Sequence, residues 1–222
     1  MSPPDDKPNS LAGSSASYSW KQARDLFVAP DWHPADHGPM PDIVANGRKP
    51  DVRACGACHR AEGTGGPENA RLAGLPVSYF VQQIADFKSG ARKMSGPDRP
   101  SISLMMRSVK GMTDAEVLAA AQYVSALKPK RNIKVVEADT IPKTGGAGTT
   151  LACGICHGPA LTGVGPIPGI AGRSPTYIVR QLYEFKTGGR SEGASALMKQ
   201  AVEKLSPEDI IALAAYVGSL EP

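Results

Sequence analysis

The chain of 222 residues contains few aromatic residues. Aromatic side chains make up 5% of the sequence, whereas glycine and proline are plentiful at 24 and 20 residues. The length suits two domains of about 100 residues each. Such domains would be short of the bulky apolar side chains that usually fill a core. This shortage predicts that something other than side chains occupies part of the interior.

Strong charge and long hydrophobic runs are absent as well. The formal net charge is +4, from 25 basic and 21 acidic residues. Lysines and arginines form no long run, so the sequence lacks the basic stripe that is typical of nucleic-acid binding. No apolar run approaches ~18 residues, and the sequence therefore predicts no membrane span.

The four cysteines of the chain all belong to one repeated pattern, Cys-x-x-Cys-His. The two copies are Cys55-Gly56-Ala57-Cys58-His59 and Cys153-Gly154-Ile155-Cys156-His157. Thiols at this spacing can add to the two vinyl groups of a haem, and the adjacent imidazole can ligate its iron. We therefore predict two covalently attached haems c, whose porphyrins would also supply the missing apolar volume.

Three other sites use closely spaced cysteines, and each fits less well. The Cys-x-x-Cys pairs of a zinc ribbon usually lie within ~20 residues of each other, whereas Cys58 and Cys153 are far apart. A thioredoxin-like dithiol would open a helix after a strand, and no strand-rich run precedes either motif. A disulfide across so short a loop would be strained. None of the three explains a histidine after each pair.

A wider internal repeat surrounds the motifs. His59 and His157 lie 98 positions apart, and identical residues recur at the same spacing in the segment that follows. Beyond Gly90 the spacing falls to 93, so the first copy carries five more residues there. The pairs at the spacing of 98 are Ala73/Ala171, Gly74/Gly172, Tyr79/Tyr177, Val81/Val179, Gln83/Gln181, Phe87/Phe185, Lys88/Lys186, Gly90/Gly188 and Arg92/Arg190.

Both copies of the repeat predict the same helices. Apolar residues at helical spacing over 79–87 and 177–185 indicate helices that end at Gly90 and Gly188. The last helix of each copy runs to residue 127 or 220 and follows a capping pattern, Thr113-Asp114-Ala115-Glu116 or Ser206-Pro207-Glu208-Asp209. The predicted fold class is all-α, with two tandem helical domains that each wrap around one haem.

The segment ahead of the first motif gives weaker signals. Residues 1–17 are rich in proline, serine and glycine and predict a loose segment. Residues 19–28 and 41–46 predict short helices. Between them lie His33 and His37, which we interpret as ordinary surface histidines, because Pro34 interrupts the helix that would align them as metal ligands.

Each iron needs a second axial ligand, and a methionine thioether suits an electron-transfer haem. In the 93-residue register Met105 aligns with Met198, whereas Met106 aligns with Lys199, which cannot ligate iron. The register therefore favours Met105 over Met106. A core-filling role is common for methionine, but Met198 is the only methionine after residue 112, so the second haem has no other candidate.

With these motifs the chain resembles the tandem diheme class I c-type cytochromes of the cytochrome c4 type. The resemblance covers about residues 42–222 and rests on the doubled motif, the repeat around it, and the methionines ahead of the capped last helices. It implies two class I cytochrome c domains. The implied division is an N-terminal extension at 1–41, partly disordered, a first domain at 42–128, a linker at 129–144 and a second domain at 145–222.

The resemblance also implies roles for individual residues. In that family a proline carbonyl orients the axial histidine. Pro168 matches this place in the second copy, whereas Ala70 occupies it in the first and leaves Pro67 as a shifted candidate. The residues that resemble those which pack on or pair with haem propionates are Tyr79, Arg92, Tyr177 and Arg190.

Together these features predict a periplasmic diheme c-type cytochrome that passes electrons through two His/Met haems. Its redox protein partners would be an oxidase, a reductase or a dehydrogenase. One alternative is a diheme oxidoreductase with an open iron, or with His33 or His37 as a ligand. Another is the haem subunit of a periplasmic dehydrogenase or reductase. Covalent haem attachment implies export, so we expect a mature chain whose leader was removed and whose Met1 was added for expression.

The partners are expected to recognise local charge. Four propionates would offset the formal charge of +4, and each ferric porphyrin would add back about one positive charge, so the holoprotein should be nearer neutral than the sequence alone. We therefore expect basic patches around Arg92-Lys93 and Lys128-Pro129-Lys130-Arg131 to steer partners, rather than a field of the whole molecule.

Overall fold

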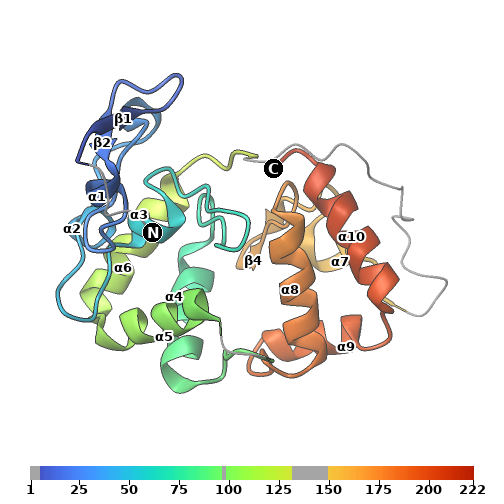
Figure 1. Ribbon diagram of the computed structural model, residues 1–222. Helices are drawn as coiled ribbons and strands as arrows, with labels where there is room; N and C mark the ends of the chain where they lie inside the picture. The colour runs from blue at the N-terminus through green and yellow to red at the C-terminus, as the bar shows by residue number, and fades with distance from the viewer. Residues whose placement is uncertain (1–5, 97–98, 132–149) are drawn as a thin grey trace.

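The computed structural model describes residues 6–96, 99–131 and 150–222, which fold into two helical lobes lying side by side (Figure 1). The first lobe follows an N-terminal extension, and the second contains the C-terminus. The predicted all-α class is confirmed, with only two short strand pairs among the described residues. Most of the predicted linker at 129–144 lies outside the described residues.

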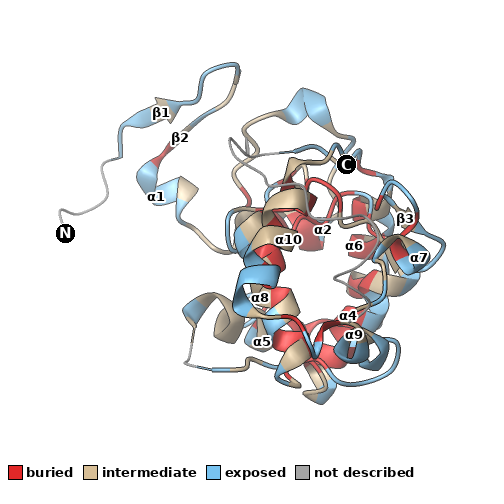
Figure 2. Cartoon of the chain, turned by 90° about the vertical axis from the view of Figure 1, so that its right-hand side faces the viewer, coloured by how far each residue is buried: buried red, intermediate tan, exposed pale blue. Residues whose placement is uncertain are grey.

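The N-terminal extension is more ordered than its composition predicts. Strands β1 (Pro8–Ser10) and β2 (Ser17–Ser19) form an antiparallel hairpin that projects from the first lobe (Figure 2). The prediction of a loose segment is therefore wrong for residues 8–17. The predicted helix at 19–28 is confined to α1 (Trp20–Ala23), capped by Ser19. A 3-10 helix (Pro34–Asp36) completes the extension, and α2 (Asp42–Ala45) begins the first lobe.

His37 fastens this extension to the first lobe. Its Nε2 atom lies 3.1 Å from Asp31 Oδ1, its Nδ1 atom lies 2.8 Å from the Gly38 carbonyl, and its ring meets Tyr123 edge-on. The side chain is only 3% exposed. The prediction of a surface histidine is thus wrong for His37, because Asp31, six residues earlier, supplies a hydrogen-bond partner and Tyr123 of the first lobe packs against the ring.

The first lobe contains α3 (Cys55–His59), α4 (Val77–Ser89), α5 (Pro100–Gly111) and α6 (Asp114–Ala126). Helix α4 packs against α5 and α6, and α2 packs on α3. As predicted, α4 ends at Gly90, whose φ of 83° is left-handed, and a capping box of Thr113 and Glu116 opens α6.

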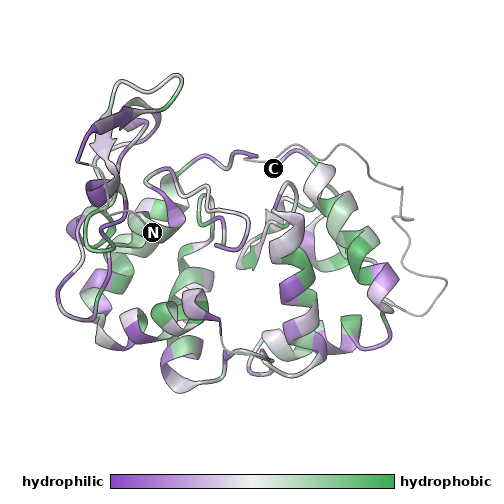
Figure 3. Ribbon diagram, viewed as in Figure 1, coloured by the Kyte–Doolittle hydropathy of each residue, from purple (hydrophilic) through white to green (hydrophobic). Residues whose placement is uncertain are grey.

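The second lobe repeats this arrangement. It contains α7 (Gly154–His157), the pair β3 (Gly163–Val164) and β4 (Ile167–Pro168), α8 (Pro175–Lys186), α9 (Ser195–Val202) and α10 (Pro207–Ser219). Helix α8 packs against α9 and α10. The predicted capping box of Ser206 and Asp209 opens α10. Apolar residues are most frequent on α6 and α10, the last helix of each lobe (Figure 3).

The side-chain core of each lobe is small. The fully enclosed positions of α6 are the alanines Ala120 and Ala121. Within the described residues, the buried phenylalanines and tyrosines are Phe80, Phe87, Tyr177 and Phe185. This agrees with the interior volume that the composition leaves to a bound group. Among the described residues, no helix is long and apolar enough to cross a membrane.

Candidate functional site

A continuous cavity of about 860 Å³ runs through both lobes. Its walls are mainly apolar and include residues of every helix from α3 to α10 except α6. Both motifs open into it, and so do Met105 and Met112 of the first lobe and Met198 of the second. The predicted ligand residues that line it are Cys55, Cys58, His59, Met105, Cys153, Cys156, His157 and Met198.

The two cysteines of each motif lie one helical turn apart and are not joined in a disulfide. Cys55 opens α3, and Cys153 caps the N-terminus of α7. Burial raises the pKa of Cys55 to about 12, and burial also raises the pKa of Cys58 and of Cys153. A redox-active dithiol needs the opposite, a thiol whose pKa is lowered. The environment therefore argues against the dithiol alternative and fits cysteines that form thioethers.

Both motif histidines are held by a backbone carbonyl eleven residues further along the chain. His59 Nδ1 lies 2.8 Å from the Ala70 carbonyl, and His157 Nδ1 lies 2.8 Å from the Pro168 carbonyl. Because a carbonyl only accepts, Nδ1 carries the proton and Nε2 keeps its lone pair for a metal. Burial lowers the pKa of both imidazoles, which keeps them neutral, as a ligand must be.

This geometry corrects one detail of the sequence interpretation. Pro168 takes the place that the resemblance implies, but in the first lobe the carbonyl comes from Ala70 and not from Pro67. The Pro67 carbonyl instead accepts a hydrogen bond of 2.9 Å from Ser174 Oγ in the second lobe. A carbonyl needs no particular side chain, so any residue that reaches this position can orient the histidine.

Met105 and Met198 occupy corresponding places in the two lobes. Met105 lies on α5 and Met198 on α9, two helices that the sequence pattern did not predict. Both residues line the cavity. Met106 is not among the lining residues and packs against the core of the first lobe. The location thus supports the preference for Met105, and the ligand assignment itself stays a prediction.

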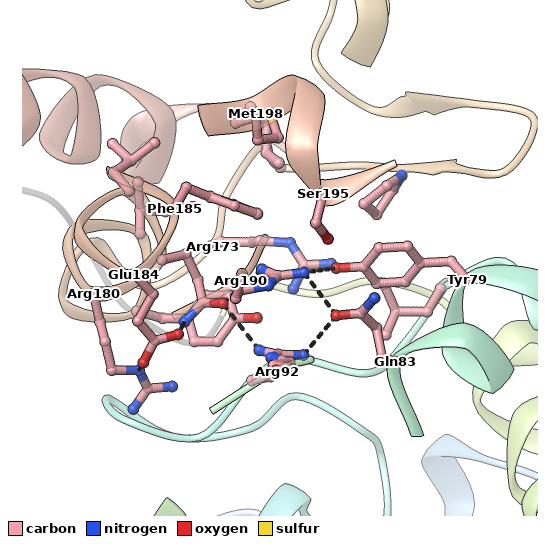
Figure 4. Close-up of a pocket in the computed structure, with 18 of the residues that line it drawn as sticks. Tyr79, Gln83, Arg92, Arg173, Arg180, Glu184, Phe185, Arg190, Ser195 and Met198 are labelled. Carbon is pink, nitrogen blue, oxygen red and sulfur yellow. Dashed lines mark hydrogen bonds and ion pairs between the residues drawn. The ribbon is translucent and has the colours of Figure 1, made fainter. Parts of the chain in front are cut away.

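Arg92 and Arg190 meet where the two lobes touch, and two glutamines join them into a ring (Figure 4). Gln83 Oε1 accepts from Arg92 at 2.8 Å and from Arg190 at 2.6 Å. Gln181 Oε1 accepts from Arg92 at 2.9 Å and from Arg190 at 2.7 Å. All four side chains are buried. We call them the arginine–glutamine ring, and each lobe contributes one arginine and one glutamine.

The glutamines of this ring were missed at the level of sequence. The repeat identified Gln83 and Gln181 as a matched pair, which was the available signal, but their role depends on a contact between lobes. Their amide groups donate to Asp86 and Glu184, at 3.1 Å and 2.9 Å. This orients each carbonyl oxygen toward the arginines.

The lobe contact concentrates buried positive charge around the cavity. Arg92, Arg173, Arg180 and Arg190 all line it. Burial and the nearby Arg92 lower the pKa of Arg190. Among the described residues, the buried Nε atom of Arg190 has no hydrogen-bond partner, and that of Arg180 has only an ion pair with Glu184 at 3.8 Å. Unpaired buried N–H groups are costly, so this wall of the cavity fits a bound group that carries acidic substituents, as a haem does.

The two predicted tyrosines lie beside these arginines. Arg190 donates to Tyr79 Oη at 3.3 Å. The buried Tyr177 ring faces the guanidinium carbons of Arg173 and Arg180 at 5.8 and 5.3 Å from its centroid. Their predicted contact with haem propionates remains a prediction, and the positions of both residues on the cavity wall are compatible with it.

Comparison with known proteins decides the family. The family model described as cytochrome c matches residues 44–128 and, again, residues 144–221. The chain belongs to the cytochrome c family. The match falls twice on the chain, once for each motif.

Relatives of this cytochrome include the thiosulfate dehydrogenase electron acceptor of Thiomonas intermedia. It is 32% identical over 181 residues, which cover 77% of this chain and 80% of the relative. Cytochrome c4 of Azotobacter vinelandii is 30% identical over 177 residues, covering 75% and 84%. Both relatives are matched over most of their length.

Solved structures of a cytochrome c4 and of a thiosulfate dehydrogenase are also similar to this chain. Cytochrome c4 from Pseudomonas stutzeri superposes with a TM-score of 0.61 at 29% identity, covering 75% of this chain and 93% of that one. A thiosulfate dehydrogenase from Marichromatium purpuratum gives 0.68 at 30% identity, and covers 91% of this chain. This cytochrome spans only 40% of that longer chain.

The predictions of family, fold, cofactor and function are thereby confirmed. The cytochrome is a diheme c-type electron-transfer protein with two class I domains and two covalently attached haems c. Each motif histidine is oriented by its carbonyl, and the cavity that receives the haems extends from one lobe into the other.

Proposed function

We propose that this cytochrome is a periplasmic electron carrier, and not itself an enzyme, in which a histidine and a methionine from the same lobe ligate each iron. The observation that carries the proposal is the shared cavity, into which His59 and Met105 open from one lobe and His157 and Met198 from the other. When bound, the haems supply iron centres that each accept or donate one electron at a time.

The residues around the cavity have distinct tasks in this proposal. Cysteines anchor through thioethers, and each histidine presents Nε2 because its Nδ1 is held by a carbonyl. The apolar walls exclude water from the cavity and raise the free-energy cost of holding net charge inside it. The arginine–glutamine ring keeps the lobes in contact and places positive charge between the two sites, where it favours the electron-rich reduced state.

We infer that a dehydrogenase is the electron donor. Two curated relatives are named thiosulfate dehydrogenase electron acceptors, from Thiomonas intermedia and Stutzerimonas stutzeri, at 32% and 30% identity. A dehydrogenase that oxidises an inorganic sulfur compound is therefore the first donor to test. The alternative is that this chain works as the haem module of an enzyme complex, which is favoured by its 91% coverage within the longer thiosulfate dehydrogenase structure.

Carbon monoxide distinguishes a closed iron from an open one. If methionines complete both sites, the reduced protein should bind carbon monoxide slowly or not at all, and the ferric protein should be low-spin at neutral pH. Reduction of the purified holoprotein by a purified thiosulfate dehydrogenase with thiosulfate would then test the donor. Rapid carbon monoxide binding, together with oxidation of thiosulfate by the cytochrome alone, would contradict the carrier function and favour an enzyme.

A further inference from the structure

The motif helix of the first lobe is covered on its outer side. Residues 26–29 and α2 lie over α3, and the Ala54 amide donates to the Leu26 carbonyl at 2.9 Å. The packing is so close that a Cβ atom placed on Gly56 would lie 2.7 Å from Ala29 Cβ and 3.0 Å from the Val44 carbonyl oxygen. The N-terminal extension therefore closes this edge of the first haem site.

The motif helix of the second lobe has no such cover among the described residues. A Cβ atom on Gly154, which corresponds to Gly56, would have Pro159 Cα at 3.7 Å as its nearest neighbour, an ordinary contact. Ile155 on α7 is 71% exposed and Val164 on β3 is 55% exposed, and neither lines the cavity. Figure 2 shows α7 and β3 as exposed segments at the edge of this lobe.

The sequences around the two motifs also differ in charge. Residues 144–172 contain no aspartate, glutamate, lysine or arginine, whereas residues 51–71 contain six. Neutral residues thus surround the second motif at places where the first copy is charged. In the 98-residue register the replacements are Arg53 by Leu151, Arg60 by Gly158, Glu62 by Ala160 and Glu68 by Pro166.

We propose that the surface around α7, with Ile155 and Val164 at its centre, is where this cytochrome docks its redox partner, and that the partner presents an uncharged, apolar face. An uncharged surface selects an uncharged partner, because burying an unpaired charge against it is costly. The proposal rests on the electron-carrier function. In each encounter one electron leaves an Fe(II) haem of the donor protein and reduces an Fe(III) haem or other one-electron centre of the acceptor.

The basic patches expected from the sequence are less suited to binding a partner than this surface is. Arg92 is buried in the arginine–glutamine ring. Lys130 pairs with Asp36 at 2.8 Å, and Arg131 pairs with Glu221 at 2.6 Å. Paired cations of this kind exert little long-range attraction. Of these two patches, only Lys93 and Lys128 are exposed and without an ion pair among the described residues. Association is therefore expected to depend little on salt.

Electron self-exchange between oxidised and reduced copies of the holoprotein provides a probe, since it brings two such surfaces together. The test variant is Ile155→Lys with Val164→Lys, which changes only exposed side chains. The matched control is Leu118→Lys, on an exposed position of α6 that is 47% accessible. We expect the double variant to exchange at least about tenfold more slowly at low salt, because like charges then face each other. The control should exchange as the wild type does.

A second readout does not depend on electron transfer. In the fully reduced protein, a neutral apolar nitroxide should broaden the amide resonances of residues 155 and 164 more than that of residue 57, the counterpart of residue 155. The lysines should weaken this effect. Equal self-exchange in the double variant and the control, or equal broadening at residues 57 and 155, would overturn the proposed surface. A wild-type exchange rate that changes several-fold between about 10 mM and about 0.3 M salt would overturn the uncharged partner.

These outcomes are separate from failure of the carrier function. If the wild-type holoprotein cannot be reduced and reoxidised reversibly, the carrier function fails whatever the lysine variants do. If it cycles normally and only the predicted difference between the variants is missing, the docking surface alone is wrong.

Discussion

The two lobes are alike on the inside and different on the outside. In both, a motif histidine donates to a carbonyl eleven residues on, and an arginine packs over a phenylalanine five residues before it, at 4.5 Å for Arg92 and 4.2 Å for Arg190. Outside, the first motif helix is covered and has charged neighbours in the sequence, while the second has neutral ones and no cover from the part of the chain that the structure describes.

This difference shows which positions the haem chemistry constrains. A residue that faces the cavity must hold the same atom in the same place in each lobe, so the repeat keeps its register there. A residue on the outer side of the motif helix is free to change with its surroundings. Ala57 and its counterpart Ile155 illustrate this, because this position of the motif helix carries a small residue in one lobe and an exposed isoleucine in the other.

Removing the thiols of one motif should have the largest effect. We expect Cys153→Ala with Cys156→Ala to leave one covalent haem per chain, attached to the first motif, and the equivalent pair at Cys55 and Cys58 to leave only the second. The reason is that each motif contains both thiols needed for its own haem. Mass spectrometry of protein matured in the periplasm of a bacterial host measures this directly. A wild-type mass that fits one haem would contradict the prediction.

Removing a methionine should open one iron and leave the other unchanged. In Met198→Ala the second haem should bind carbon monoxide when reduced and should have a lower potential, because it loses a thioether ligand. Met105→Ala should do the same at the first haem. Met106→Ala is the matched control, since Met106 lies outside the cavity lining. If Met106→Ala opens the first iron and Met105→Ala does not, the register argument for the ligand fails.

Most of this inner architecture could be predicted from the sequence. Two thiols and an imidazole at fixed spacing describe a haem site without any knowledge of the fold, and capping boxes at Thr113 and Ser206 mark helix starts through local hydrogen bonds. The helices α5 and α9 gave no comparable signal. No side chain caps the N-terminus of either helix, and both lie in the region where the two copies of the repeat differ in length.

Contacts between distant segments could not be predicted in this way. The arginine–glutamine ring joins residues about a hundred positions apart, and only the fold brings them together. The role of Ala70 was missed because a backbone carbonyl leaves no trace in the sequence. The anchoring of His37 was missed because proline-rich segments give no periodic pattern from which to infer burial.

The glycine pair offers a finer test of the difference between the lobes. We expect Gly56→Ala to destabilise the protein by about 1–3 kcal/mol, because its methyl group would collide with Ala29 and with the Val44 carbonyl. Gly154→Ala should be neutral, or stabilising by about 0.5–1 kcal/mol, because the site has room and alanine favours the helix. Denaturant unfolding of both holoproteins measures the difference. If the two variants were equally stable, the extension would not pack closely against α3 in solution.

The smallest expected effect concerns how the extension is fastened to the first lobe. Burial alone would lower the pKa of His37, but hydrogen bonds to the Gly38 carbonyl and to Asp31, with the charge of Asp31, outweigh it and raise the pKa. A raised pKa in the folded state means that folding is more favourable when His37 is protonated. The resulting stabilisation is fully present below the ordinary value of 6.5 and is lost as the pH rises through the folded-state pKa.

Amide hydrogen exchange should detect this as protection of residues 29–46 that is greater at pH 6 than at pH 8 after correction for intrinsic rates. Asp31→Asn should remove most of the pH dependence, because it deletes the negative charge that favours protonated His37. The amides of α8 and α10 serve as an internal control, since His37 contacts neither. If protection of residues 29–46 is the same at both pH values in the wild type, then His37 does not hold the extension by its charge, and the cover over the first motif helix rests on apolar packing alone.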